Sequence, residues 1–158
     1  LSFSARARDV SQDATNFGSE LPVVREQQMV RDGAATLLDI PVDDRYRVKV
    51  RIYAFDESTN DTMQVSFTTE QNGTRTTGPL RTLQRTCHAD ECAWTPYYGE
   101  VDLPAGAAGA RVNVYIDESG TATPVLLWAM ASVTNNRTQQ VTIVSARGAS
   151  DVCRNCTQ

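Results

Sequence analysis

Histidine is nearly absent from this chain: His88 is the only one among 158 residues. A Ser-His-Asp or Cys-His arrangement needs an imidazole as its general base, so any such site would have to use His88. That residue follows Cys87, in a segment that we expect a disulfide to tether. Glu100 and Asp102 share one face of a predicted strand, but carboxylates that alternate with apolar residues are typical of a solvated face. The sequence therefore predicts a protein that is not an enzyme.

Long hydrophobic runs are also missing. A membrane-spanning helix needs about 20 consecutive apolar residues, and no run in the sequence approaches that length. The formal net charge is −4, and residues of both signs are interspersed. No basic stripe is therefore available to follow a phosphate backbone or an acidic membrane. We expect a soluble protein that neither inserts into a membrane nor binds nucleic acid.

The length of the chain fits one ordinary domain. A fold of 158 residues buries about two thirds of the surface of its unfolded chain, which is enough for a core. Residues 1–18 are polar and have no helical periodicity, so we expect an extended N-terminal arm, and residues 19–158 are expected to form the domain. The chain begins at Leu1 without a methionine, as a processed protein would.

Residues 124–145 contain the most hydrophobic stretch. From Val125 to Val133, apolar residues occupy both faces of a period-two pattern, which is typical of a strand in the middle of a core. We therefore expect Trp128, inside this stretch, to be a core residue. Residues 134–138 are a polar break rich in turn formers, and residues 140–144 resume with β-branched side chains, so the segment is predicted to be a hairpin.

Alternating apolar and polar residues predict the other strands, since no stretch keeps helical spacing for three turns. Over residues 46–55 the apolar side chains face one way, and the charged side chains and Tyr53 face the other. Residues 63–68 return as the hairpin partner, and Asn72-Gly73 marks the next turn because both residues tolerate positive φ. Further strands are expected at 21–30, 35–42, 99–103 and 110–116, and a weaker one at 80–86. The predicted fold is all-β: a single β-sandwich, Ig-like or jelly-roll-like, of about nine or ten strands.

The cysteines indicate a compartment. Cys87, Cys92, Cys153 and Cys156 are even in number and lie outside the hydrophobic strands, which predicts disulfides and therefore secretion into an oxidising, extracellular environment. Three pairings are possible, and the sequence does not choose between them. The alternative is a tetrahedral zinc site, because Cys-x4-Cys, Cys-x2-Cys and the adjacent His88 are the ligand types that zinc prefers. That alternative needs a reducing, cytosolic context.

Acidic turns suggest a calcium ion as a cofactor. Asp56, Glu57, Asn60 and Asp61 gather oxygen ligands in one predicted loop. Asp117 and Glu118 supply carboxylates to another. Loops of extracellular β-proteins often bind calcium through such residues, although the spacing fits no defined calcium loop and surface turns also use these residue types.

The densest aromatic group is Trp94, Tyr97 and Tyr98. If these rings are exposed, they could stack on sugar rings, because aromatic faces bury apolar CH groups while hydroxyls bond to nearby polar side chains. If they are buried, they only pack beneath the loop.

Glycosylation is suggested by four Asn-x-Ser/Thr sequons. They begin at Asn60, Asn72, Asn136 and Asn155, and three of them fall in predicted turns, where an acceptor would be exposed. The protein is therefore a candidate glycoprotein if its source glycosylates secreted proteins.

The N-terminal arm has the pattern of a strand. Phe3, Ala5 and Ala7 fall on one face, and polar or basic residues fall on the other, which suits addition to the edge of a sheet. Our first hypothesis is a secreted, non-enzymatic structural or adhesive protein, a subunit of an extracellular filament assembled by donation of this arm. Its partners would be other copies of itself or other extracellular proteins. The alternative is a carbohydrate-binding module whose partners are glycans.

Two segments carry a resemblance. LLWAMASVTNNRTQQVTIV (126–144) and LLDIPVDDRYRVKVRIYAF (37–55) resemble β-sandwich segments that recur in large secreted bacterial proteins of unassigned function. The resemblance covers about two thirds of the chain as a pattern. It implies secretion and an all-β fold, and it carries over no active-site residue.

Overall fold

The computed structural model describes residues 5–7, 19–21, 23–31, 33–58, 60–86, 95–119 and 125–148. These residues form thirteen β-strands and one short 3-10 helix, η1(Glu26–Gln28). The prediction of an all-β protein is therefore confirmed. No helix in this part of the chain is long and apolar enough to cross a membrane.

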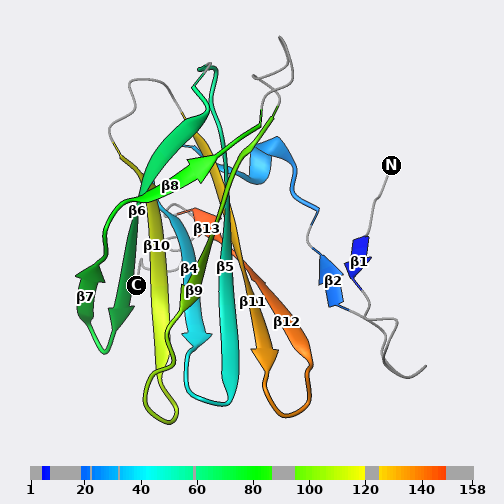
Figure 1. The fold of residues 1–158 in the computed structure, drawn as a ribbon, viewed down its shortest axis with the longest axis vertical. Coiled ribbons are helices and arrows are strands. Elements are labelled where there is room, and N and C mark those ends of the chain that lie inside the picture. The colour runs from blue at the N-terminus through cyan, green and yellow to red at the C-terminus, as the bar shows by residue number, and fades with distance from the viewer. Residues whose placement is uncertain are drawn as a thin grey trace, which may run out of the picture.

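Eleven of the strands belong to one antiparallel sheet (Figure 1). Its members are β3(Val30–Arg31), β4(Ala35–Pro41), β5(Tyr46–Phe55), β6(Thr62–Gln71), β7(Thr74–Thr77), β8(Arg81–Gln84), β9(Tyr97–Leu103), β10(Arg111–Glu118), β11(Leu126–Asn135), β12(Val141–Ser145) and β13(Arg147–Gly148). The predicted hairpin of β11 and β12 is confirmed, because the two strands pair. The predicted hairpin of β5 and β6 is wrong: the two strands follow each other in the chain, but β5 pairs with β11 and β9, whereas β6 pairs with β7, β8 and β10.

The strand order makes the sheet nearly closed and barrel-like. It runs β12-β11-β5-β9-β8-β6-β10-β4-β13, with β3 beside β11 and β7 beside β6. Its two ends, β12 and β13, are separated in the chain only by Ala146. The N–H of Ala146 donates to the carbonyl of Ala129 at 2.8 Å, and Gly148 is paired with Ala35 of β4. One segment, residues 141–148, therefore pairs first with β11 and then with β4.

A sandwich of two separate sheets is not confirmed, because β8 pairs with both β6 and β9 and so links all these strands into one sheet. The strand count also exceeds the nine or ten predicted.

Residues 21–30, predicted as one strand, hold the end of β2(Ser19–Leu21), then η1 and the start of β3. The Gln28 N–H donates to the Arg25 carbonyl at 2.8 Å and the Arg25 N–H to the Gln28 side chain at 3.0 Å, which closes a local turn instead of a ladder.

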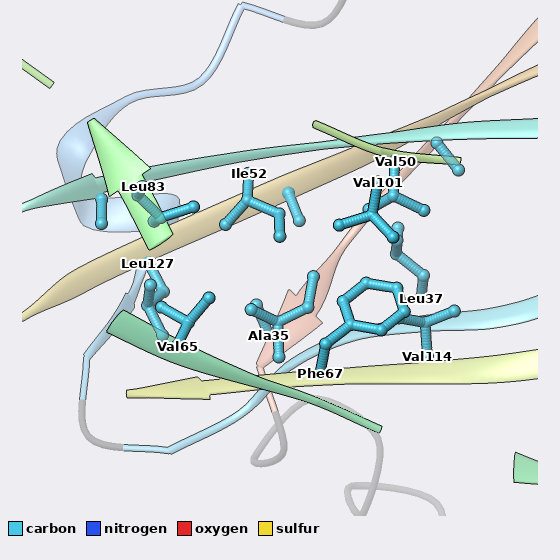
Figure 2. Packing of buried hydrophobic residues seen from close by; sticks show 14 of the residues in the cluster. Ala35, Leu37, Val50, Ile52, Val65, Phe67, Leu83, Val101, Val114 and Leu127 are labelled. Atoms are coloured by element: carbon cyan, nitrogen blue, oxygen red, sulfur yellow. The ribbon is translucent and has the colours of Figure 1, made fainter. Parts of the chain in front are cut away.

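The core lies between the two halves of the curved sheet. Period-two alternation sends Val50 and Ile52 of β5 to the interior, where they are fully buried. Figure 2 shows these side chains and Val101 facing Phe67 and Val114 across the interior. At the thin junction between β8 and β9, Gly99 allows a close approach: a Cβ atom there would stand 2.6 Å from Leu83 Cδ2.

Turns and bulges connect these strands. The predicted turn at Asn72-Gly73 is confirmed, since both residues have positive φ, 51° and 78°. In β4, Asp39 also has positive φ, 58°, and the pairing with β10 shifts register there. The Asp39 N–H donates to Asn113 Oδ1 at 2.9 Å, which holds this bulge in place.

The N-terminal segment forms a small sheet of its own. β1(Ala5–Ala7) pairs with β2(Ser19–Leu21) in an antiparallel register with Ala5 opposite Leu21. This two-stranded sheet is separate from the eleven-stranded one, and β2 lies near β12 (Figure 1). Ala5 and Ala7 of the predicted arm are therefore in a strand, whereas Phe3 lies outside the described residues.

Candidate functional site

Three aromatic side chains lie side by side on the outer face of the sheet. The registers place Tyr53 of β5 directly between Trp128 of β11 and Tyr98 of β9. The ring centroids are 5.3 Å apart for Tyr53 and Trp128 and 5.2 Å apart for Tyr53 and Tyr98. Tyr98 is 39% exposed, and the other two are half-buried. We call Tyr53, Tyr98 and Trp128 the aromatic row.

The expectation that Trp128 is a core residue is wrong. Leu127 and Ala129 on either side of it point inward and are buried, so alternation turns Trp128 to the outer face. Met130 shares that outer face and is buried to 7% exposure, yet it is not part of the interior cluster. The outer face of β11 therefore has its own apolar patch, which explains why both faces of this strand are hydrophobic in the sequence.

The predicted aromatic group is only partly reproduced. Tyr97 is fully buried and belongs to the core, whereas its neighbour Tyr98 is exposed, as alternation along β9 requires. Trp94 lies outside the described residues. Of the three predicted sugar-stacking residues, Tyr98 alone is in the aromatic row. Tyr53 and Trp128 could not be joined to it from spacing, because 45 and 30 residues separate them from it along the chain.

Charged side chains form a second row next to the first. Glu100 follows Tyr98 on the same face of β9 and accepts hydrogen bonds from Lys49 Nζ at 2.7 Å, from Arg51 Nε at 3.0 Å and from the Tyr98 hydroxyl. Arg51 also donates to Ser132 Oγ of β11 at 3.1 Å. We call Lys49, Arg51 and Glu100 the charged row. The charged row lies on β5 and β9, two of the three strands of the aromatic row, and reaches β11 through the bond from Arg51 to Ser132.

Contacts in the charged row shift the pKa values of Glu100 and of the neighbouring Tyr98. The hydrogen bond from Lys49, followed by that from Tyr98, lowers the pKa of Glu100 from 4.5 to about 2. Burial and then the bond to Glu100 raise the pKa of Tyr98 to about 12. Lys49 also stands 3.9 Å from Asp102. Both carboxylates that alternate with apolar residues on β9 are thus engaged with a cation on β5.

An arginine occupies the loop where calcium was predicted. Arg85, whose side chain is fully buried, donates from Nε to the Asn60 carbonyl at 2.8 Å and from Nη2 to the Ser58 carbonyl. Its Nη1 lies 3.5 Å from the carboxylate of Asp56, which is 4% exposed. The guanidinium stacks on the Tyr97 ring at 4.2 Å, and the Tyr97 hydroxyl donates to the Asn60 carbonyl at 2.9 Å. The guanidinium of Arg85 therefore binds two carbonyls of this loop and lies beside the carboxylate of Asp56.

Calcium finds no support in this geometry. Among the residues that the structure describes, no group of three or more His, Cys, Asp or Glu side chains could hold a metal ion. Asp56 also accepts from the N–H of Ser58 at 3.2 Å. Glu57 and Asp61 remain candidates only by sequence, and the same holds for Asp117 and Glu118.

The cysteine predictions fall outside the described residues. Cys87, Cys92, Cys153 and Cys156 lie there, and so does His88. Disulfide bonding, its connectivity and the zinc alternative therefore stay predictions.

The sequons differ in their surroundings. Asn72 is exposed at the tip of the hairpin between β6 and β7. The Asn136 side chain donates to the Asp44 carbonyl at 2.8 Å, so a glycan on that nitrogen would disrupt a contact between two turns. Asn60 is exposed, and its backbone carbonyl binds Arg85. Asn155 lies outside the described residues.

We expect Arg85→Met to lower the free energy of unfolding by about 3–5 kcal/mol, because it leaves the buried Asp56 carboxylate without its cation. The matched control is Arg81→Met, at an exposed position on the same strand, which should change stability by less than about 0.5 kcal/mol. Urea unfolding followed by circular dichroism measures both. Equal losses in the two variants would contradict the role of Arg85, as would unchanged proteolysis of the loop at residues 56–61.

The lowered pKa of Glu100 predicts a pH dependence of stability. Because the folded pKa is about 2 and the ordinary value is 4.5, the contribution of Glu100 is complete above pH 4.5 and is lost as the pH falls toward 2. Glu100→Gln should therefore flatten the decline of the urea midpoint between pH 4.5 and 2. Part of the decline should remain, because the Arg45 side chain also lowers the pKa of Asp43 to about 2. An unaltered slope in the variant would refute the assignment.

Comparison with known proteins returned no similar protein: no family model, no curated protein and no solved structure matches this chain.

Proposed function

We propose that the protein is a secreted, non-enzymatic module that works by contact and binds carbohydrate through the aromatic row. The observation that carries this proposal is the placement of Trp128, Tyr53 and Tyr98 as direct cross-strand neighbours on a solvent-facing surface. Aromatic faces bury the apolar CH groups of sugars, and polar groups at the edge bond to hydroxyls. The charged row next to the rings supplies those polar groups.

The chemistry of the charged row supports binding in preference to hydrolysis. A general acid in glycoside hydrolysis needs a carboxyl group whose pKa is raised toward the working pH. The pKa of Glu100 is instead about 2, because the carboxylate accepts bonds from Lys49 and Tyr98. A carboxylate in this state orients donors and accepts hydrogen bonds, but it is a poor source of protons.

Secretion is the part of the proposal that depends on the sequence. Four cysteines outside the predicted strands favour an oxidising compartment. Secretion and glycan binding together would give an adhesive role, because a secreted module that binds glycans attaches the protein that contains it to a glycan-covered surface. A sandwich arrangement, Ig-like or jelly-roll-like, is part of the proposal, and it would give such a module a rigid face.

We expect binding on a glycan array and in polysaccharide pull-downs to weaken stepwise as the aromatic rings are replaced by alanine. Tyr98→Ala and Trp128→Ala should each weaken binding about two- to twelvefold, as for the loss of ~0.5–1.5 kcal/mol of stacking. The control is Tyr115→Ala, since Tyr115 lies on β10 and stacks with Arg75 at 4.4 Å, away from both rows. Binding that survives the double variant Tyr98→Ala/Trp128→Ala would reject the site.

A second candidate function, assembly into an extracellular filament, has an observation of its own. β1 is a three-residue strand in a separate two-stranded sheet, and an isolated pair of strands is only marginally stable in water. β12, near which β2 lies, stands at one end of the strand order of the main sheet. An N-terminal strand could therefore leave its own chain and be added to a neighbouring subunit.

Deleting residues 1–10 should leave a folded monomer that no longer assembles, because the donated strand is removed and the main sheet is kept. Ala5→Pro should weaken assembly in the same direction, since proline removes a backbone donor from the first residue of β1. Light scattering after size exclusion and electron microscopy of fibres measure the outcome. Unchanged assembly in the deletion variant would rule out strand donation.

A further inference from the structure

We infer that the acceptor for the N-terminal strand is the edge of β9 in a second copy of this chain, where the basic face of the strand meets the acidic face of the edge. This inference rests on the second candidate function, assembly by strand donation. It names the acceptor site, the chemistry that recognises the strand and the register of the contact.

One side of β9 is paired along its whole length, and the other side is paired at one end only. Toward β5 the ladder runs from Tyr97 to Leu103. Toward β8 there is one pair, Gln84 with Tyr98. The N–H and C=O groups of a strand point alternately to its two sides. In the part of the chain that the structure describes, residues 100–103 therefore have backbone groups on the β8 side that no strand pairs with.

The side chains along this edge alternate in chemistry. Val101 is 7% exposed, and Leu103 packs against the core while partly buried. Glu100 and Asp102 lie on the outer face, and the Asp102 side chain is 75% exposed although Lys49 Nζ stands 3.9 Å from its carboxylate. A strand added here would therefore meet apolar side chains on the inner face and carboxylates on the outer face.

The N-terminal strand has the matching alternation in its sequence. Ala5 and Ala7 fall on one face of the period-two pattern, and Arg6 and Arg8 fall on the other. The small alanines suit the apolar face of the acceptor edge. The two arginines suit its carboxylates.

One antiparallel register satisfies both faces. It sets Arg6 opposite Asp102, and it sets Arg8 opposite Glu100. Because Asp102 is itself opposite Lys49 of β5, the charges on the outer face would alternate in sign across three strands. Opposite charges placed directly across an antiparallel pair stabilise it, and like charges destabilise it.

The other edges of the eleven-stranded sheet lack this match. β12 has no charged residue, and β3, β7, β8 and β13 each have an arginine, which would repel a basic strand. The carboxylate of β4 is Asp39, which lies at the bulge and already binds Arg111. The edge of β9 is therefore the one that selects a strand with a basic face.

Donor and acceptor lie on different parts of the molecule. β1 is paired with β2, which lies near β12, and β11 and β5 separate β12 from β9 in the strand order (Figure 1). A contact between two different surfaces is heterologous, so each added copy brings a new donor and a new acceptor. Donation to β9 would therefore add subunits head to tail.

Charge reversal in the full chain tests the inference. Arg6→Glu and Asp102→Arg should each raise the concentration needed for assembly about tenfold, because an attractive cross-strand pair becomes a repulsive one. The double variant Arg6→Glu/Asp102→Arg should restore assembly to within about threefold of the unmodified chain. An equimolar mixture of the two single variants should also assemble, because each variant then meets the opposite charge in the other. Light scattering after size exclusion measures every sample.

A control and a second readout separate recognition from a general effect of charge. Glu57→Arg, at an exposed position in the connection between β5 and β6, should assemble as the unmodified chain does. Amide hydrogen exchange at residues 100–103 should slow on assembly, since a new ladder protects these groups. Weakening of the control to the same degree, or unchanged exchange at residues 100–103, would overturn the inference.

The outcomes also separate this inference from strand donation itself. If deletion of residues 1–10 abolishes assembly while both charge-reversal variants assemble unchanged, the acceptor is another edge and strand donation remains. If the deletion variant assembles unchanged, or the unmodified chain stays monomeric at every concentration, both proposals fail. A double variant as weak as the single variants would refute the pairing of Arg6 with Asp102.

Discussion

The pairing of β5 with β11 is the constraint on which the rest of the structure depends. The two strands match residue for residue over ten consecutive pairs, from Tyr46 opposite Asn135 to Phe55 opposite Leu126. Because side chains alternate, a slip of one residue would turn the buried set of either strand to solvent. The same register places Trp128 beside Tyr53. The core and the candidate binding surface are therefore two consequences of one alignment.

Closure of the sheet adds the second constraint. Residues 141–148 pair with β11 at one end and with β4 at the other, so the same short segment forms both ends of the strand order. Near the thin junction of β8 with β9, the buried Arg85 guanidinium binds the loop carbonyls of Ser58 and Asn60. This contact joins the connection between β5 and β6 to the end of β8, where the ladder itself contributes only one pair, Gln84 with Tyr98.

Local patterning predicted the elements well and the surfaces poorly. Alternation over residues 46–55 identified β5 and its buried face correctly, because period two is a property of a strand alone. For β11 both faces are apolar, so the pattern could not say which residues are internal, and Trp128 was assigned to the core. The burial of Arg85 was equally hidden, because its partners are backbone carbonyls of a distant loop. Register between strands far apart in sequence, as for Tyr53 and Tyr98, has no local signal.

The aromatic row is not needed to complete the core. Tyr97, Leu37 and Ile52 already fill the interior and are fully buried, whereas the row lies on the opposite face of the sheet. An outer face that served only stability could carry polar residues, as the charged row does two positions away along β5 and β9. Three aromatic rings kept partly in water across three strands cost hydrophobic free energy that burial elsewhere would recover. Contact with a ligand that covers the rings would recover it, and this is the physical reason for the proposal that binding takes place on this face.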